Sequence, residues 1–368
     1  MDELSPQERA VYELIAANPF VAQGEIAQTL GLARSTVAAH VVNLVRKGCI
    51  LGRGYVLPRP RRIACIGAAA IDRKYHVAGT LLPGTSNPAS GGRSFGGVAR
   101  NVVETLARLG VATSFVTILG ADEAGRDIIR HLGDLGVDTS QVVTMGGRAT
   151  AEYVAILDPA KDLAFGIADM AIFESFDLAH LNRAWPHLAS ADWIFADCNL
   201  PAPVLAGVVE RARAGRASLA VNAVSAPKAA RLPADLAGIE LLFANRDEAA
   251  AILGVTAAPE VMAERLRARG AARVVLTIGA EGALVLDGDH PPRHVAAWQA
   301  VPRDVTGAGD ALVAGMLYRL LSGAATLDAA RTGTLLAALT VESEATVLPE
   351  LTSALLEQAA AGRMIMEC

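Results

Sequence analysis

The sequence predicts an α/β protein with three layers and a mostly parallel sheet, preceded by a small helical module. From about residue 100 onward, segments with helical periodicity alternate with short apolar runs, which is typical of a parallel sheet covered by helices on both faces. Residues 1–62 carry eight Lys/Arg against five Asp/Glu, and no acid occurs between Glu25 and Asp72. We therefore expect a basic module joined to an acidic, enzyme-sized body.

Composition limits the class of protein. The 368 residues are 52% hydrophobic and 19% charged, with a net charge of −5, which favours a large buried core over disorder. The N-terminus is acidic and lacks the apolar region of a signal peptide, and no run of 18 uncharged apolar residues occurs, so a cytoplasmic protein without a membrane span is expected. The cysteines show no metal-ligand or C-x-x-C spacing, which predicts reduced thiols; they are Cys49, Cys65, Cys198 and Cys368.

Three helices are predicted in the N-terminal module. Ser5 followed by Pro6 and Glu8 is typical of an N-cap with a capping box. The segment "QGEIAQTLGL" predicts a second helix that ends at Gly31. The segment "ARSTVAAHVVNLVRKG" predicts a third helix, and "CILGRGYVL" two short strands. The apolar side of the third helix is predicted to consist of Val37, Val41, Leu44 and Val45.

This arrangement resembles a winged helix-turn-helix over residues 1–58, followed by a linker over residues 59–62. In that family the third helix enters the major groove of DNA, while the wing contacts the phosphate backbone. The resemblance implies base contacts from Ser35, Thr36, His40 and Asn43, and phosphate contacts from Arg34, Arg46, Lys47 and Arg53. The alternative is a docking or dimerisation module whose polar stripe is only solvated.

The large domain is predicted over residues 63–364. Its buried strands include "RIACI", "SFVTIL", "DWIFAD", "SLAVN", "ELLFAN" and "RVVLTIG". Two segments, residues 73–97 and 150–170, break the alternation and predict antiparallel strands outside the main sheet, placed as a lid over the site. The carboxyl ends of parallel strands form the usual site edge. The polar residues that fall there are Asp72, Asp197, Asn199, Asn222, Asn245, Glu248 and Thr277.

The stretch "DVTGAGDALVAGML", residues 304–317, is a candidate phosphate site. The chain has no G-x-x-x-x-G-K-[ST] and no G-x-G-x-x-G after its first strand, so a P-loop and a dinucleotide fold are not expected. Gly307, Ala308 and Gly309 precede a helical pattern, and the amides at a helix N-terminus bind anions. From the stretch alone, Asp310 is either a capping acid or a base that accepts a proton from an attacking hydroxyl.

Four ordered motifs resemble the ribokinase-like (PfkB) family of carbohydrate and nucleoside kinases. These are "GGVARN" (96–101), "NRDE" (245–248), "TIGAEGA" (277–283) and "DVTGAGD" (304–310). The resemblance covers about residues 63–364 and implies a ribokinase-like fold with a small β lid, ATP as phosphoryl donor and Mg²⁺ as cofactor.

The resemblance also implies roles for individual residues. Asp310 would be the catalytic base, with Gly307, Ala308 and Gly309 as the anion hole. Asp72, Gly96, Gly97 and Asn101 would bind the acceptor. Asn245, Glu248, Thr277, Gly279 and Gly282 would bind the nucleotide, with Glu248 holding Mg²⁺ through water. Asp304 and Thr306 match a loop that binds a monovalent cation such as K⁺ in several relatives.

Within the family, "TSNP" (85–88), "GGVARN", "AVSAPKA" (223–229) and "LTVESEATV" (339–347) look most like the pseudouridine kinases. The implied reaction transfers the γ-phosphoryl of ATP to a nucleoside 5′-hydroxyl. Asn222 and Ala99 depart from the usual Asp and Gly, which leaves another nucleoside or a ribose-like sugar as an alternative acceptor. A regulator that uses a kinase-like body as its ligand sensor is the other alternative. A homodimer is expected because lid-mediated dimers occur among relatives.

Overall fold

The computed structural model describes residues 4–47, 49–50, 61–160 and 162–366. The chain divides into two compact units, Met1–Pro60 and Arg61–Cys368. The last two residues of the predicted linker belong to the second unit, because Arg62 begins strand β1 and the Arg61 guanidinium donates to the carbonyl of Leu321. The other two linker residues lie outside the described part.

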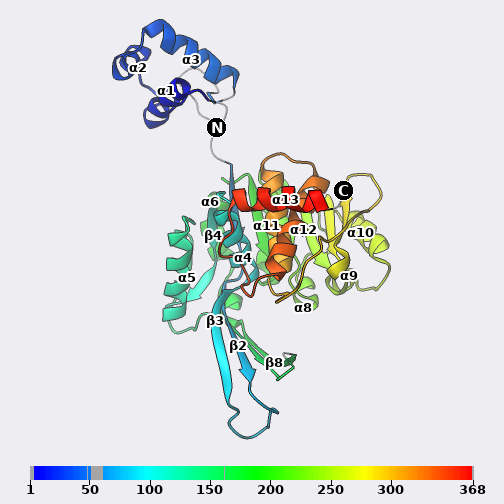
Figure 1. The fold of residues 1–368 in the computed structure, drawn as a ribbon. Helices are drawn as coiled ribbons and strands as arrows, with labels where there is room; N and C mark the ends of the chain where they lie inside the picture. Colours follow the sequence, from blue (N-terminus) through cyan, green and yellow to red (C-terminus); the bar gives the residue numbers. More distant parts are fainter. Residues whose placement is uncertain (1–3, 48, 51–60, 161, 367–368) are drawn as a thin grey trace. The chain divides into compact units, whose positions relative to one another are not determined.

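The first unit contains the three predicted helices, α1 (Pro6–Ala17), α2 (Gln23–Leu30) and α3 (Arg34–Arg46) (Figure 1). The capping box forms as expected, with Ser5 Oγ accepting from the amide of Glu8 and Glu8 Oε2 accepting from the amide of Ser5. The core contains Val11, Ile15, Ile26, Val37 and Leu44. Val45, by contrast, is 47% exposed, so its predicted place on the apolar side of α3 is wrong. The predicted wing, including Arg53, lies outside the described residues beyond Ile50.

The second unit is built on an eight-stranded sheet with the order β14-β13-β12-β11-β10-β9-β1-β4. Neighbours from β12 to β4 pair in parallel, and β13 and β14 add an antiparallel edge. The strands are β1 (Arg62–Ile66), β4 (Ala112–Val116), β9 (Trp193–Asp197), β10 (Ser218–Asn222), β11 (Leu241–Asn245), β12 (Arg273–Thr277), β13 (Ala283–Asp287) and β14 (Arg293–Val295). All six buried strands expected from the sequence are present.

Helices cover both faces of this sheet, as three layers require. Along β1, Ala64 and Ile66 face one core, while Ile63 and Cys65 face the other. The first core packs against α6 (Leu178–Leu188), α7 (Ala202–Ala214), α8 (Ala226–Ala229), α9 (Arg246–Leu253) and α10 (Pro259–Ala268). The second packs against α4 (Val98–Arg108), α5 (Glu123–Asp134), α11 (Ala308–Leu321) and α12 (Thr326–Val341). The α13 helix (Ser353–Met366) follows α12 in the chain, and the short helices are η1 (Ala171–Ser175) and η2 (Gly279–Glu281).

The two segments that interrupt the alternation form a separate four-stranded sheet with the order β3-β2-β7-β8. The β2–β3 and β7–β8 pairs are antiparallel as expected, but β2 and β7 pair in parallel across the middle. The strands are β2 (Ala70–Val77), β3 (Ala89–Gly96), β7 (Glu152–Leu157) and β8 (Leu163–Asp169). Figure 1 shows β2 and β3 extending away from the main sheet. A further two-stranded sheet joins β5 (Ile118–Gly120) and β6 (Val143–Met145).

Candidate functional site

Asp310 lies in the first turn of α11, which begins immediately after Gly307. Gly307 has a φ of 84°, and a Cβ at this position would lie 2.2 Å from the carbonyl oxygen of Thr346, so only glycine fits this entry to the helix. The first amides of a helix have no partner within the helix itself. One of them, that of Ala308, makes a 3.3 Å hydrogen bond to the carbonyl of Val305. The glycine entry thus presents a helix N-terminus beside a carboxylate, as the motif predicts.

Burial, together with the nearby carboxylates of Asp197 and Asp72, raises the pKa of Asp310 from its ordinary 3.8 to about 7. Asn101 acts in the opposite direction, because its Nδ2 donates to Asp310 Oδ2 over 2.6 Å, and the positive charge of Arg100 adds to that effect. A carboxyl group with a pKa near 7 is half ionised at neutral pH, which suits a general base. The structure therefore brings the predicted residues Asp310, Asn101 and Asp72 into one electrostatic group.

A buried arginine supports this group. Arg100 donates to Asn101 Oδ1 and to Glu104, and its Nη2 donates to the carbonyl of Phe95 over 2.9 Å. Glu104 is also paired with Arg108, 2.7 Å from Glu104 Oε1 to Arg108 Nη2. The amide of Asn101 is therefore oriented by a chain of charged groups along α4, so that its Nδ2 points to Asp310. The motif "GGVARN" contained this arginine, but its role depends on partners that only the fold brings together.

Asp197, at the end of β9, binds backbone amides from three segments of the chain through its buried carboxylate. Its carboxylate accepts from the amides of Ala68 (3.0 Å), Ala99 (2.9 Å) and Asn199 (2.9 Å), and the residue is completely buried. These bonds join the end of β9 to the loop after β1 and to the start of α4. Asp197 thus positions the helix that carries Asn101, a role that its place at a strand end did not reveal.

Asp72 is the predicted acceptor-binding acid on lid strand β2. Burial raises its pKa, and the charges of Arg100 and Lys74 oppose that shift. A Cβ at Gly96 would lie 2.2 Å from Asp72 Oδ2, and a Cβ at Gly97 would lie 2.5 Å from the carbonyl oxygen of Ala68. The two glycines therefore give room to the protein's own groups. Their part in binding the acceptor stays a prediction.

A cavity of about 570 Å³ adjoins the N-terminus of α11. It contains the predicted residues Thr277, Gly279 and Gly282, and its walls are largely apolar. The α12 helix contributes Ala338 and Val341 to it. A smaller cavity of about 140 Å³ contains Asp310, Asn222, Asn245 and Glu248. Both are lined by Thr277, Gly309 and Leu312, so the two cavities meet at the N-terminus of α11.

The predicted pair Asn245 and Glu248 forms a capping box at the start of α9. Asn245 Oδ1 accepts from the amide of Glu248, while the Glu248 carboxylate accepts from both the amide and the Nδ2 of Asn245, each over 2.9 Å. Burial raises the pKa of Glu248. Within the part of the chain that the structure describes, no cluster of three His, Cys, Asp or Glu could hold a metal by itself. A cation here would need ligands from water and from a bound phosphate.

One residue of the small cavity was not predicted. Val224 lines it and has a φ of 70°, which is rare for a β-branched residue; its amide donates to Asn222 Oδ1 over 2.8 Å. Strained backbone of this kind often marks binding sites. Lys228, in the segment "AVSAPKA", donates to Asn199, and burial lowers the pKa of the lysine.

The predicted cation-binding pair, Asp304 and Thr306, precedes the glycine entry. The Asp304 Oδ1 accepts from the amide of Thr306 over 2.8 Å. Its other oxygen is paired with Lys74 of the lid, whose Nζ also lies 3.3 Å from Thr306 Oγ1. The lysine was not predicted, because it is distant in sequence from the motif.

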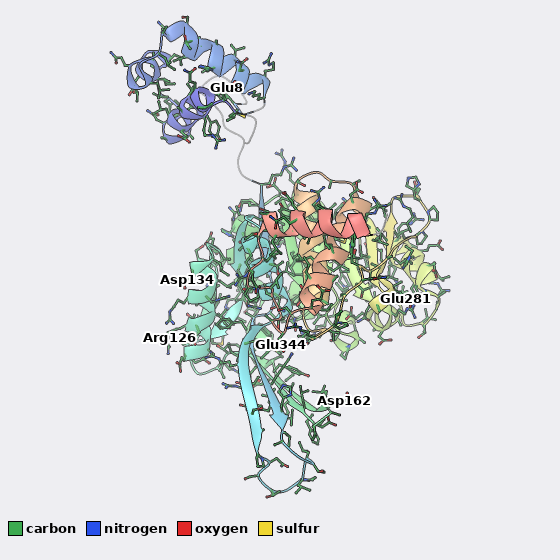
Figure 2. All side chains as sticks on the ribbon, in the orientation of Figure 1. Glu8, Arg126, Asp134, Asp162, Glu281 and Glu344 are labelled. Atoms are coloured by element: carbon green, nitrogen blue, oxygen red, sulfur yellow. The ribbon has the colours of Figure 1, made fainter. Side chains whose placement is uncertain are left out.

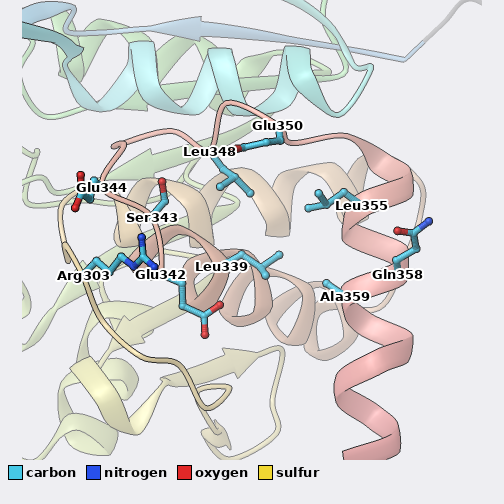
Figure 3. A pocket seen from close by; sticks show the side chains of 10 residues that line it. All are labelled: Arg303, Leu339, Glu342, Ser343, Glu344, Leu348, Glu350, Leu355, Gln358 and Ala359. Atoms are coloured by element: carbon cyan, nitrogen blue, oxygen red, sulfur yellow. The ribbon is translucent and has the colours of Figure 1, made fainter.

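Another groove, of about 730 Å³, lies between the loop after α12 and helix α13. Figure 3 shows Arg303, Glu342 and Glu344 from the loops on one side, and Leu355 and Gln358 from α13 on the other. It contains none of the predicted site residues. Glu281 lies in the turn beside the cavity of about 570 Å³. Figure 2 shows it on a different part of the surface from Asp162 of the lid.

On the N-terminal module, three predicted DNA-contacting residues stand at the start of α3. Arg34 and Ser35 are exposed and Thr36 is half-buried. Asn43 accepts from Arg46 over 3.3 Å. Two predicted contacts need correction. Both ring nitrogens of His40 are buried without a hydrogen-bond partner in the described residues, so His40 does not present them to a base.

Lys47 is the second correction. Its Nζ lies 2.9 Å from Glu8 Oε2, which ties the end of α3 to the start of α1. The amide of Ser5 and the Lys47 charge together lower the pKa of Glu8 to about 2, so the carboxylate is ionised at neutral pH. The Lys47 charge is therefore balanced by Glu8 within the module, which disfavours the predicted phosphate contact.

The α11 helix begins after a glycine, carries a carboxyl group with a pKa of about 7, and adjoins an apolar cavity. With the three-layer sheet, these features are those of a phosphotransferase with the ribokinase-like fold. Residues 60–353 match the model of the pfkB family carbohydrate kinases, and the chain belongs to that family. Residues 4–50 match the model of the winged helix-turn-helix DNA-binding family. None of the helices in the described ranges has both the length and the hydropathy that a membrane span requires.

Known relatives agree with this assignment. The uncharacterized sugar kinase YeiI of Escherichia coli is 28% identical, over 89% of this chain and 91% of its own length. The pseudouridine kinase of Escherichia coli is 27% identical, over 79% and 94%. A solved carbohydrate kinase from Agrobacterium tumefaciens is 29% identical with a TM-score of 0.70, covering 82% of this chain and 97% of that one. The ribokinase of Arabidopsis thaliana, solved with ribose and ATP, shares the fold with a TM-score of 0.73 at 19% identity, over 81% and 98%.

Proposed function

We propose that the chain is an ATP-dependent kinase that transfers the γ-phosphoryl group to the 5′-hydroxyl of pseudouridine. The observation that carries the proposal is the Asp310 carboxyl, with its pKa of about 7, on the wall of a cavity that adjoins an apolar, nucleotide-sized one. The hydroxyl proton passes to Asp310 as the hydroxyl oxygen bonds to the γ-phosphorus, and the bond from that phosphorus to the β-γ bridging oxygen breaks. The first amides of α11 stabilise the charge on the phosphoryl oxygens.

Mg²⁺ fits this site through water. The Glu248 carboxylate is buried at the small cavity and offers the hard oxygen that Mg²⁺ prefers, with Asn245 beside it. When bound, the ion would neutralise charge on the ATP phosphates, and Gly309, which lines both cavities, lets those phosphates approach the backbone.

The choice of pseudouridine rests on "TSNP", "GGVARN" and "AVSAPKA", together with the similarity to the pseudouridine kinase of Escherichia coli. The comparable similarity to a sugar kinase keeps a ribose-like sugar or another nucleoside as the alternative. The two are separated by one assay of ADP release with pseudouridine, uridine, inosine and ribose at equal enzyme concentration. We expect the highest kcat/KM with pseudouridine; a higher value with another acceptor would replace it.

Asp310→Asn tests the chemistry. It retains the shape of the side chain but cannot accept the proton, so we expect kcat to fall by about 10²–10⁴-fold. Asp289→Asn is the control, since the Asp289 side chain is fully exposed. Full activity in Asp310→Asn would refute the assigned base. Saturable binding of nucleoside to the wild type with no turnover under Mg-ATP would instead favour the ligand-sensor alternative.

We also propose that the N-terminal module binds DNA through the start of α3. Arg34 and Ser35 are exposed there, at a helix N-terminus that favours phosphate, and the acid-free segment surrounds them. Fluorescence anisotropy with mixed-sequence duplex DNA should show an affinity that falls steeply with salt, and Arg34→Ala should reduce the slope by about one. Lys47→Ala is the matched control and should leave the slope unchanged, because Lys47 is paired with Glu8. No binding at low salt would leave the docking alternative.

A homodimer remains part of the proposal. Leu163, Phe165 and Ile167 alternate along β8 and are all exposed, which gives the lid sheet an apolar row at its edge strand. Sedimentation velocity should give twice the chain mass, and Phe165→Asp should reduce it to one chain.

A further inference from the structure

Lys74 joins the lid to the loop that leads into the phosphate-binding helix. It follows Asp72 by two residues on β2, so both side chains stand on the same face of the lid sheet. Its Nζ is paired with Asp304 Oδ2 and lies 3.3 Å from Thr306 Oγ1. Both members of the ion pair are half-buried. The lysine thus spans the distance from the acceptor-binding strand to the start of the anion-binding stretch.

The ion pair balances the negative charge of Asp304 in this loop. Burial alone would raise the pKa of Asp304, but the hydrogen bonds from Lys74 and Thr306 outweigh it and lower that pKa. Asp304 is therefore ionised at neutral pH, and its charge is already balanced by an ammonium group. Asp304 Oδ1 in turn accepts from the Thr306 amide, so neither oxygen of this carboxylate is without a partner.

This arrangement does not fit the monovalent cation that the family resemblance implies. A K⁺ ion bound by Asp304 and Thr306 would have to share the same oxygens with an ammonium group at contact distance. The two positive charges would repel each other across a half-buried site, where screening by solvent is weak. The side chains present here hold an internal cation and leave no charge for an external one.

We propose that Lys74 is a built-in substitute for the monovalent cation, and that the enzyme therefore works without K⁺. Lys74 is a positioning residue in this role. It fixes the Asp304–Gly309 loop, and through it the start of α11 and Asp310, from the strand that carries Asp72. The proposal rests on the kinase function proposed above, since the loop is taken to bind phosphate.

The test compares Lys74→Met with Arg73→Met. Arg73 is the neighbouring cation on β2, and its Nε is paired with Glu152 over 2.7 Å, on the other face of the strand. Each variant loses one half-buried ion pair of the lid, but only Lys74→Met removes the cation from Asp304. Lys74→Arg keeps the charge and is the conservative variant. ADP release is measured with the best acceptor of the panel, in KCl and in choline chloride at equal ionic strength.

For the wild type, we expect the rates of ADP release in KCl and in choline chloride to agree within about twofold. The same should hold for Arg73→Met. Lys74→Met should lose at least tenfold in choline chloride and regain part of it in KCl, while Lys74→Arg stays near wild type. Activation of the wild type by K⁺ of fivefold or more would overturn the proposal, and so would Lys74→Met behaving like Arg73→Met.

A binding measurement separates failure of this proposal from failure of the kinase function. Thallium-205 NMR detects Tl⁺, a spectroscopic probe for K⁺, whether or not any acceptor in the panel is phosphorylated. The folded wild-type chain should show no saturable Tl⁺ binding in nitrate buffer, and Lys74→Met should bind Tl⁺ that potassium nitrate displaces. Saturable Tl⁺ binding to the wild type, displaced by potassium nitrate, would refute the built-in cation even where turnover is absent. Lack of Tl⁺ binding by folded Lys74→Met would refute it as well.

Discussion

The two sides of the proposed kinase site consist of different kinds of residue. The proposed acceptor side is made of buried charged groups and one amide, in which Glu104, Arg100 and Asn101 lead to Asp310 through direct contacts. The proposed nucleotide side is lined mostly by glycines and apolar side chains, Trp298 among them, around a cavity of about 570 Å³. One side sets a protonation state, while the other provides shape and backbone amides. Substitutions on the first side should therefore reduce stability or activity for electrostatic reasons, and those on the second side for steric reasons.

The sharpest test of the charged side is Arg100→Met. Removing this buried arginine leaves Asn101 Oδ1 without its donor and leaves Glu104 with Arg108 and His131 as its remaining partners. Loss of one member of a buried ion pair costs up to about 3–5 kcal/mol of unfolding free energy. Urea denaturation followed by circular dichroism measures this loss. Arg126→Met on the exposed surface of α5 (Figure 2) is the control and should stay within about 0.5 kcal/mol. A loss below about 1 kcal/mol in Arg100→Met would show that the charges are not coupled to the fold.

Two glycines separated by one residue test the other side. Gly307→Ala places a Cβ 2.2 Å from the Thr346 carbonyl at a φ of 84°, and we expect it to lose about 1–3 kcal/mol of stability as well as activity. A Cβ at Gly309 meets no protein atom within 4 Å, so Gly309→Ala should fold normally. Its activity should nevertheless fall about tenfold or more, because the methyl group stands where a phosphate must approach. Equal stability of the two variants would contradict this distinction.

The smallest expected effect is a displaced pH profile. With the pKa of Asp310 at about 7, kcat/KM should fall about tenfold per pH unit below 7, as the base becomes protonated. Asn101→Ala removes a hydrogen bond that favours the ionised carboxylate, so this limb should move to higher pH. Thr105→Val, which loses only a bond to the Asn101 carbonyl, is the control and should not move it. If the acid side of the kcat/KM profile stays at the same pH in Asn101→Ala, Asn101 does not influence the pKa of Asp310.

The same raised pKa has a consequence for stability. A carboxyl group whose pKa is higher in the folded state than its ordinary 3.8 holds its proton more tightly when folded. The contribution of Asp310 to the unfolding free energy is therefore greatest below pH 4 and is lost as pH rises towards 7. Asp310→Asn should remove this dependence, which urea titrations at pH 5 and pH 7 measure.

Local patterns in the sequence predicted much of this molecule. The buried strands, the capping box at Ser5 and the glycine entry at Gly307 all depend on residues close together in the chain. Predictions failed where the partner is distant. Lys74 meets Asp304 across 230 residues, and Lys47 meets Glu8 across 39. Side-chain type and spacing do not specify such pairs, because the fold alone decides which charged groups meet.

The burial of Asp197 and its neighbours has a consequence for the conditions in which the enzyme operates. The charges of Asp197 and Arg100 act on Asp310 from inside the protein, because both side chains are almost completely buried. Salt screens charges on the surface, over about 8 Å at physiological ionic strength, far more than it screens charges enclosed by protein. The pKa of Asp310 should therefore depend less on the salt concentration of the medium than the pKa of an exposed carboxyl group does.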